Sequence, residues 1–597
     1  MGAIRAYVLP YMASLVAKKK AHKLYYYLVE SGRVEGKPRI TRQIYLGTAE
    51  KVAALVKQGS APLPLEAISR RAGLPGALWL AAQRSGVFDL LQSIWPPPRS
   101  APSTAHYLLL AAFHRICEAG PKTEVADWYR DTILESLWQF PADRFTSQAF
   151  WDCFQQIKLS PLPAPAALDP EQDELDRAQL QLLQLWKDQH LVSQRLLSYA
   201  TTNFYTFVAS THQRNTLAQR GHHKQGRHNL RQVGLSYLLD GVNGLALCHQ
   251  VYPGNVPDTE EFSIALPRRL HFLDENRIAR SSITVVFDKG SAARYNTLAL
   301  EESGLGWISA LPWNQAPPEF RETPLEKFTP LSSAHPGVLA FAQKVWVHGR
   351  ERLCVLKYSA SFWSEQMHSL TTSLAQVTQS LRRLSLGLSK PHCRLKENHI
   401  RGKIARWLGS TQFLHELVRY ELKPEDSERW GLQFDVDTTA LHRLMTERLG
   451  RTILMSNRME WTAEQVVSGY GGQPSVEKIF RGLKDGDWLN WGPMYHWTDS
   501  KIRVHAFSCM LGISLLNYLH AQGQKACPQI TVEQFKDELH DILQYVLLYP
   551  PQGDKGPYRT ATIQSKLNLN QTLLAEAIGL DSLISVKKKV GKTNRDQ

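Results

Sequence analysis

Two acidic residues stand where a folded chain could use them to hold a divalent cation. Asp288 follows the nearly all-apolar run 283–287, which predicts a buried strand with the acid held rigidly at its end. Glu477 lies in the first turn of a predicted helix and shares a face with Arg481 and Lys484. Carboxylates for Mg²⁺ beside bases for phosphate oxygens would suit phosphodiester chemistry. Each acid also has an ordinary interpretation, Asp288 as a turn or helix cap and Glu477 as the surface partner of Arg481.

The elements around Asp288 predict a mixed α/β sheet. In chain order they are strands at 199–208, 232–239 and 245–252, a helix at 262–276, a strand at 283–287, a helix at 292–303 and a strand at 306–311. The turn Asp240-Gly-Val-Asn-Gly244 joins the second and third strands as a hairpin. Three early antiparallel strands, followed by parallel strands reached through helices, form the order of an RNase H-like α/β core.

The charge balance favours a polyanionic partner. The chain has 70 Lys and Arg against 55 Asp and Glu, a net charge of +15, and nucleic acid is the commonest partner of such a protein. A merely basic soluble protein is the alternative. Lys18, Lys19 and Lys20 precede two predicted strands, 24–29 and 39–46, where they would touch a DNA backbone or protect a sheet edge.

Cysteine and hydropathy patterns narrow the class of protein further. Seven cysteines without a C-x-x-C pair argue against a zinc ribbon and against a secreted disulfide scaffold. No apolar run reaches the roughly 18 residues of a transmembrane helix, and the start does not read as a signal peptide. The expectation is a cytoplasmic protein without a membrane partner.

Several motifs, taken in order, resemble a known family. They are Tyr25-Tyr-Tyr-Leu-Val-Glu-Ser31, Tyr199-Ala-Thr-Thr-Asn-Phe204, Val251-Tyr-Pro-Gly-Asn255 with Asp258, Phe287-Asp-Lys-Gly290, Tyr470…Glu477…Lys484 and Tyr495-His-Trp-Thr-Asp-Ser-Lys-Ile-Arg-Val-His505. Over most of its length the chain resembles the DDE transposases of bacterial insertion sequences, in the insertion sequence 4 superfamily near its insertion sequence 1634 branch. The family's signature is Tyr, two residues, Arg, three residues, Glu, six residues, Lys. Tyr470, Glu477 and Lys484 match it, and Gln473 replaces the arginine.

The resemblance implies a cut-and-paste DNA transposase. It makes Asp288 the second and Glu477 the third catalytic carboxylate, both as ligands of Mg²⁺, with Mn²⁺ as a substitute. Tyr470 and Lys484 would contact DNA near the cut strand, and Gln473 and Arg481 belong to the same DNA-binding set. The implied partners are the terminal inverted repeats, the target DNA and a second copy of the chain, at the nucleoid of a bacterium.

The first carboxylate position of this family falls on Ala200. A methyl group cannot ligate magnesium, a hard cation that takes oxygen ligands, and loss of a shared carboxylate should nearly abolish cleavage. We therefore expect a transposase that is catalytically dead as the chain stands, whether by a targeted change or by natural loss. Asp240 is a weak substitute, because Asp before Gly is an ordinary turn residue.

Two alternatives follow from the same residues. A catalytically inert, transposase-derived DNA-binding protein would need no carboxylate at Ala200. A nuclease with the same core would cut DNA without joining strands.

Length and pattern divide the 597 residues into several regions. Helices are expected at 63–72 and 532–548, and a hairpin and later strands between the second and third acids. The predicted regions are a basic β-hairpin region (1–60), a helical DNA-end-binding region (61–190), the RNase H-like catalytic core (191–320 and 456–525), a mixed α+β insertion (321–455) and a C-terminal helical region with a basic tail (526–597).

Overall fold

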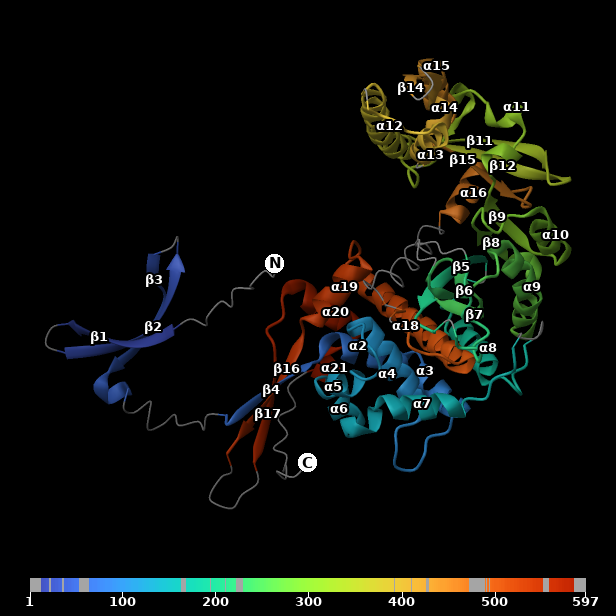
Figure 1. Cartoon of the computed structure of the whole chain (residues 1–597). Coiled ribbons are helices and arrows are strands. Elements are labelled where there is room, and N and C mark those ends of the chain that lie inside the picture. The colour runs from blue at the N-terminus through green and yellow to red at the C-terminus, as the bar shows by residue number, and fades with distance from the viewer. Residues whose placement is uncertain are drawn as a thin grey trace. The chain divides into compact units, whose positions relative to one another are not determined.

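In the computed structural model the chain forms two compact units (Figure 1). The first comprises 1–70, 543–565 and 585–597, and the second comprises 71–542 and 566–584. Within these, the structure describes residues 12–20, 23–34, 37–52, 64–162, 168–193, 195–209, 211–221, 229–390, 392–409, 411–425, 429–471, 489, 491–492, 494–550 and 558–584.

The described residues of the first unit form two small antiparallel sheets. One has the order β1-β2-β3, and its strands are β1 (Met12–Lys20), β2 (Lys23–Val34) and β3 (Lys37–Thr48). The other has the order β17-β16-β4, and its strands are β4 (Glu66–Arg71), β16 (Leu543–Tyr549) and β17 (Arg559–Gln564). The lysines 18–20 therefore lie inside a third strand, β1, and do not precede the sheet.

Two predicted helices are wrong in whole or in part, because residues in them form strands of the second sheet. The sequence pattern predicts helices at 63–72 and 532–548, but α19 ends at His540 and both β4 and β16 are strands. The Leu65 N–H donates to the Leu548 carbonyl at 2.7 Å, a pairing between segments more than 480 residues apart in sequence. Because that partner is distant, the local periodicity of each segment could not show it.

The helical part of the second unit is built around one long helix. Its helices are α2 (Gly73–Arg84), α3 (Val87–Ile94), α4 (Thr104–Cys117), α5 (Val125–Arg130), α6 (Ile133–Trp138), α7 (Ser147–Gln156), α8 (Glu174–Asp188), α18 (Asp499–Ala526), α19 (Val532–His540), α20 (Leu569–Ile578) and α21 (Asp581–Ile584). Helix α18 packs against α4, α2, α7, α20 and strand β7 (Figure 1). The predicted helical region 61–190 therefore shares one hydrophobic core with a helix from the far end of the chain.

Helix α18 is apolar on most of its faces. Among the described residues it is the one helix long and apolar enough to cross a membrane, with a mean hydropathy of 1.3 over 18 residues. Since 94% of that window is buried inside the protein, the helix has the properties of a core helix.

A nine-stranded mixed sheet forms the rest of the second unit's framework. Its order is β10-β11-β12-β15-β9-β8-β5-β6-β7. The strands are β5 (Leu196–Thr206), β6 (Arg231–Asp240), β7 (Ala246–Pro253), β8 (Thr284–Phe287), β9 (Gly306–Ala310), β10 (Thr329–Pro330), β11 (Val338–Val347), β12 (Arg350–Ser359) and β15 (Arg451–Ser456). Strands β5, β6 and β7 pair antiparallel, and β5, β8 and β9 pair parallel. This pattern is the predicted one and is compatible with an RNase H-like core.

Helices cover both faces of this sheet. Helices α9 (Asp258–Glu275) and α10 (Arg294–Glu302) lie on one face, where the Phe262 ring meets those of Tyr199 and Phe287 at 4.7 and 5.2 Å. Helix α16 (Ala463–Tyr470) lies on the opposite face, where Val466 and Val467 pack with the apolar residues of β8, β9, β12 and β15. The short α11 (Pro318–Arg321) follows β9.

The region between the second and third predicted acids splits into two parts. Strands β10, β11, β12 and β15 continue the main sheet, although the sequence pattern assigned 321–455 as a whole to the insertion. Residues 360–449 form a smaller body with its own core. Its elements are α12 (Ala360–Leu388), α13 (Glu397–Leu408), α14 (Leu414–Leu417), β13 (Val418–Pro424), β14 (Trp430–Val436) and α15 (Thr438–Glu447).

Candidate active site

The parallel pairing of β5 and β8 brings Ala200 and Asp288 together. The register runs from Leu196 opposite Thr284 to Ser198 opposite Val286. Continuing it by two residues sets Ala200 opposite Asp288, and neighbouring strands lie only about 4.8 Å apart. The predicted first and second carboxylate positions are therefore neighbours on one face of the sheet.

Asp288 lies at the carboxyl end of β8 with an exposed side chain. Its Oδ1 accepts hydrogen bonds from the backbone N–H groups of Gly290 at 2.9 Å and Ser291 at 3.3 Å. Asp288 therefore also caps the turn that follows the strand, as its ordinary interpretation predicts. The cap engages one carboxylate oxygen at the exposed rim of the sheet, where a ligand could approach.

Helix α16 ends over the face that carries Ala200. Leu196 shares that face with Ala200 because side chains alternate along a strand. Gly469 lies against Leu196 and Ile308, and Tyr470, the last residue of α16, is half-buried in the same apolar cluster. The remaining predicted site residues, Gln473, Glu477, Arg481 and Lys484, lie outside the described residues.

Among the described residues, the surroundings of Ala200 are polar but supply no second carboxylate. Ala200 is half-buried, and Ser198 and Thr202 flank it on the same face with their side chains buried. In the part of the chain that the structure describes, neither hydroxyl has a hydrogen-bond partner. No group of three His, Cys, Asp or Glu side chains suited to a metal occurs among the described residues. Asp288 alone does not fit the ligand demand of two Mg²⁺ ions.

Asp240 does not lie beside Asp288 in the predicted site. Its carboxylate accepts hydrogen bonds from Ser193 N, Ser193 Oγ, Val242 N and Asn243 N, at 2.6–3.2 Å. It pairs across the sheet with Leu197, whose side chain points to the face opposite Ala200. Asp240 is therefore a buried turn cap, as an Asp before Gly predicts.

The Val251–Asn255 motif holds the sheet together. A Cβ on Gly254 would lie 2.0 Å from the Gln232 carbonyl oxygen, so only glycine permits this close approach. The buried Tyr252 hydroxyl lies 3.4 Å from Asp258 Oδ1 and 3.5 Å from Asn203 Oδ1. These contacts join β7 to β5 and to the start of α9, and they give the motif a structural role.

The three N-terminal lysines predicted to meet DNA, residues 18–20, lie in the first unit. Lys18 and Lys19 are exposed on β1, and Lys20 pairs with Lys23 at the end of the hairpin. The Lys18 Nζ donates to Gln43 Oε1 at 3.2 Å. Contact between these lysines and DNA stays a prediction.

Comparisons with known proteins add little to this geometry. No protein-family model and no curated protein matches the chain. Among solved structures, a cryo-EM structure of a piggyBac transposase synaptic complex with hairpin DNA matches 78% of this chain and 76% of that one. Its TM-score of 0.32 and identity of 10% make it a weak structural neighbour of transposase type, too distant to carry an argument about function.

Sequence reasoning missed a pocket between α4, α7 and the segment before α18. It is lined by Lys122, Trp151, Trp497 and Lys501, among others. The available signal was the density of aromatic and basic residues in Tyr495–His505, a motif used only as a mark of resemblance. The partners from α4 and α7 lie more than 340 residues earlier, so spacing could not reveal them.

Proposed function

We propose that this chain is a DNA transposase of the DDE type that binds DNA ends and is unable to cut them as it stands. The observation that carries the proposal is the parallel register of β5 and β8, whose continuation by two residues sets Ala200 beside Asp288. A resemblance based on local motifs does not by itself require the two positions to adjoin. An enzyme that shares divalent cations between two carboxylates does require it.

The residues present support binding and not cleavage. A net charge of +15 suits a DNA partner, with strong salt dependence because phosphate contacts release counterions. The alanine at 200 removes an oxygen ligand that the two-metal reaction needs. The described residues of the site supply one carboxylate, Asp288. We therefore assign no cleavage step to this chain as it stands. Glu477 as the third ligand is part of the proposal, as are the terminal repeats and the homodimer.

The test restores the carboxylate. The chain, Ala200→Asp and the uncharged control Ala200→Asn are each mixed with duplexes carrying the DNA that flanks the coding sequence, with Mg²⁺ present. We expect all three to bind and only Ala200→Asp to nick the duplex. A pre-cleaved end and a plasmid are then added, because joined products separate a transposase from a nuclease. Cleavage by the chain as given, or by Ala200→Asn, would overturn the site assignment.

The second candidate function is an inert DNA-binding protein derived from a transposase, and Ala200 itself favours it. Tight and end-specific binding by all three proteins, with no cleavage by Ala200→Asp, would support this alternative.

A further inference from the structure

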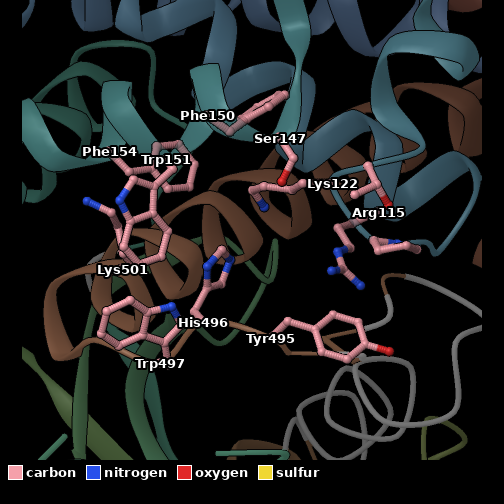
Figure 2. Close-up of a pocket in the computed structure, with 12 residues that line it drawn as sticks. Arg115, Lys122, Ser147, Phe150, Trp151, Phe154, Tyr495, His496, Trp497 and Lys501 are labelled. Carbon is pink, nitrogen blue, oxygen red and sulfur yellow. The ribbon is translucent and has the colours of Figure 1, made fainter. Parts of the chain in front are cut away.

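A pocket of about 490 Å³ lies among α4, α7 and α18 in the second unit, a volume typical of small-molecule sites. Figure 2 shows Arg115, Lys122 and His496 around its centre, with Trp151 and Trp497 together on one side and Tyr495 on another. None of the described residues that line it is acidic.

Three cations converge on this pocket. Arg115 is buried and donates to the Gly492 carbonyl at 2.7 Å. Lys501 is fully buried, and its Nζ donates to Gln155 Oε1 at 2.7 Å. Lys122 lies over the rings of Phe150 and Phe154, with Nζ to centroid distances of 5.6 and 5.4 Å. Glu124 and Asp152 act on Arg115 and Lys501 from outside the lining, but no carboxylate lines the pocket among the described residues. Three cations gathered in this way favour an anionic ligand, because burying like charges together is unfavourable.

Aromatic rings form the other part of the pocket. Trp151 and Trp497 stack on each other at 5.2 Å, and the Lys501 Nζ lies 4.8 Å from the Trp151 ring centroid. Tyr495 is 61% exposed and Trp497 is 41% exposed, so each presents ring surface to an incoming ligand. Any nucleobase can stack on such a surface, because stacking uses the face of the ring and not its hydrogen-bonding edge.

We propose that this pocket binds one nucleotide unit of an unpaired DNA strand, with the phosphate at Lys122 and Arg115 and the base on Tyr495 and Trp497. Aromatic platforms beside cations are the recurring design of single-strand binding sites. A paired base cannot offer its face to a ring without leaving the stack, so the pocket should discriminate against an intact duplex. This inference rests on the proposed function in taking DNA as the partner.

The pocket lies along the strand that carries the candidate active site. Phe207, directly after β5, stacks on Tyr495 with ring centroids 5.9 Å apart. Seven residues of extended chain separate Ala200 from Phe207, a span of about 23 Å. At the spacing of about 3.4 Å per nucleotide in duplex DNA, this span corresponds to roughly seven nucleotides, and a more extended unpaired strand covers it in fewer. An unpaired strand of about ten nucleotides is therefore a suitable probe.

Proton binding gives a second readout. Burial lowers the pKa of Lys122 to about 7, with Arg115 adding to the effect, and burial lowers the pKa of Lys501 to about 8. In the part of the chain that the structure describes, Lys122 and Lys501 are surrounded by further charged or titratable groups from every packed element. They are Arg115, His114 and Glu124 near α4, Asp152 and Cys153 of α7, Tyr495 and His496 before α18, and His505 and Cys509 of α18. Burial holds the pKa of each of the three histidines far below its usual value, so the two lysines are the cations that titrate between about pH 6 and 8.5. A bound phosphate favours protonated Lys122, so affinity should fall as pH rises through this range.

The experiment measures fluorescence anisotropy of a labelled single-stranded oligothymidylate of about ten nucleotides and of a blunt duplex of the same length. The pocket variant combines Lys122→Met with Trp497→Ala. The matched control combines Lys344→Ala with Trp346→Ala, an exposed lysine and tryptophan on β11. We expect the pocket variant to lose about tenfold or more in single-strand affinity, on the order of one stacked base, with duplex affinity unchanged. The control should bind both probes as the parent does.

Three results separate the explanations. Parental single-strand binding by the pocket variant, or an equal loss for both probes, would overturn the proposal. Competition by free thymidine monophosphate as strong as that by the oligonucleotide would also overturn it, by making the pocket a free-nucleotide site. Lys122→Arg should bind the strand with weaker pH dependence, and Trp497→Ala alone supplies the test if Lys122→Met does not fold. The Ala200→Asp cleavage assay is scored separately, so either idea can fail without the other.

Discussion

Introducing a carboxylate at position 200 should change stability before any DNA is added. The register of β5 and β8 places the new carboxylate about 5 Å from that of Asp288. Two like charges at about 5 Å repel by about 3 kcal/mol at an effective dielectric of about 20, and by about 1 kcal/mol in bulk water. Because Asp288 is exposed, the lower half of this range applies. We expect Ala200→Asp to be about 1–2 kcal/mol less stable than Ala200→Asn at neutral pH in EDTA.

A divalent cation should reverse this loss. An ion that binds the folded state alone stabilises it by about 2.7 kcal/mol at a concentration 100 times its Kd. Thermal unfolding in EDTA and in Mg²⁺, followed by tryptophan fluorescence, measures both effects. The chain as given and Ala200→Asn should show little response to Mg²⁺, since neither has the paired carboxylates.

The double variant Ala200→Asp, Asp288→Asn isolates the pair. In EDTA this variant should regain the stability that Ala200→Asp loses, and it should not respond to Mg²⁺. A double-mutant cycle over the two positions then gives their interaction energy. Equal stability of Ala200→Asp and Ala200→Asn in EDTA, with no response to Mg²⁺, would refute the adjacency of positions 200 and 288.

Four further substitutions test other parts of the fold by thermal unfolding. Gly234→Ala sets a methyl group 2.2 Å from the Tyr252 ring and should lower the free energy of unfolding by about 1–3 kcal/mol. Gly387→Ala, in open space on α12, should instead raise it by about 0.5–1 kcal/mol. Similar effects of the two substitutions would contradict the packing around Gly234. Asp240→Ala removes the acceptor of the turn's hydrogen bonds and should cost about 1–3 kcal/mol. When it is added to Ala200→Asp, Asp240→Ala should leave the stabilisation by Mg²⁺ unchanged. Loss of that stabilisation would indicate that Asp240 is a ligand of the cation. Burial raises the pKa of Glu261 from 4.5 to about 7, so the stability gained from its protonation is present below pH 4.5 and is lost as pH rises through about 7. Glu261→Gln should therefore flatten the fall in stability between about pH 5 and 8, and an unchanged slope would count against this assignment.

Local patterns in the chain were sufficient to predict most of the sheet's elements. The apolar run 283–287 is the buried strand β8, and the hairpin around Asp240-Gly-Val-Asn-Gly244 is β6–β7. Each of these signals lies within a few residues, because alternation and turn chemistry are set by neighbours along the chain. The same locality explains why Asp288 was identified as a strand-end acid.

Other features depend on partners far away in sequence. The strand state of Glu66–Arg71 and Leu543–Tyr549 depends on pairing between opposite ends of the chain, and a segment's periodicity cannot record a partner it does not touch. The strands β11, β12 and β15 join the main sheet for the same reason. The pocket likewise needs Lys122 and Trp151 to meet Trp497 through the packing of α4 and α7 with α18.

The candidate active site likewise depends partly on local sequence and partly on tertiary structure. The resemblance carried by local motifs predicted Ala200 and Asp288 as two carboxylate positions, with alanine in place of the first acid. Their adjacency is a property of strand register, which is established only when β5 and β8 bury their side chains in a shared core. A slip of one residue would turn Ala200 to the opposite face, so the sheet and not the motif determines whether a carboxylate at position 200 would lie beside Asp288.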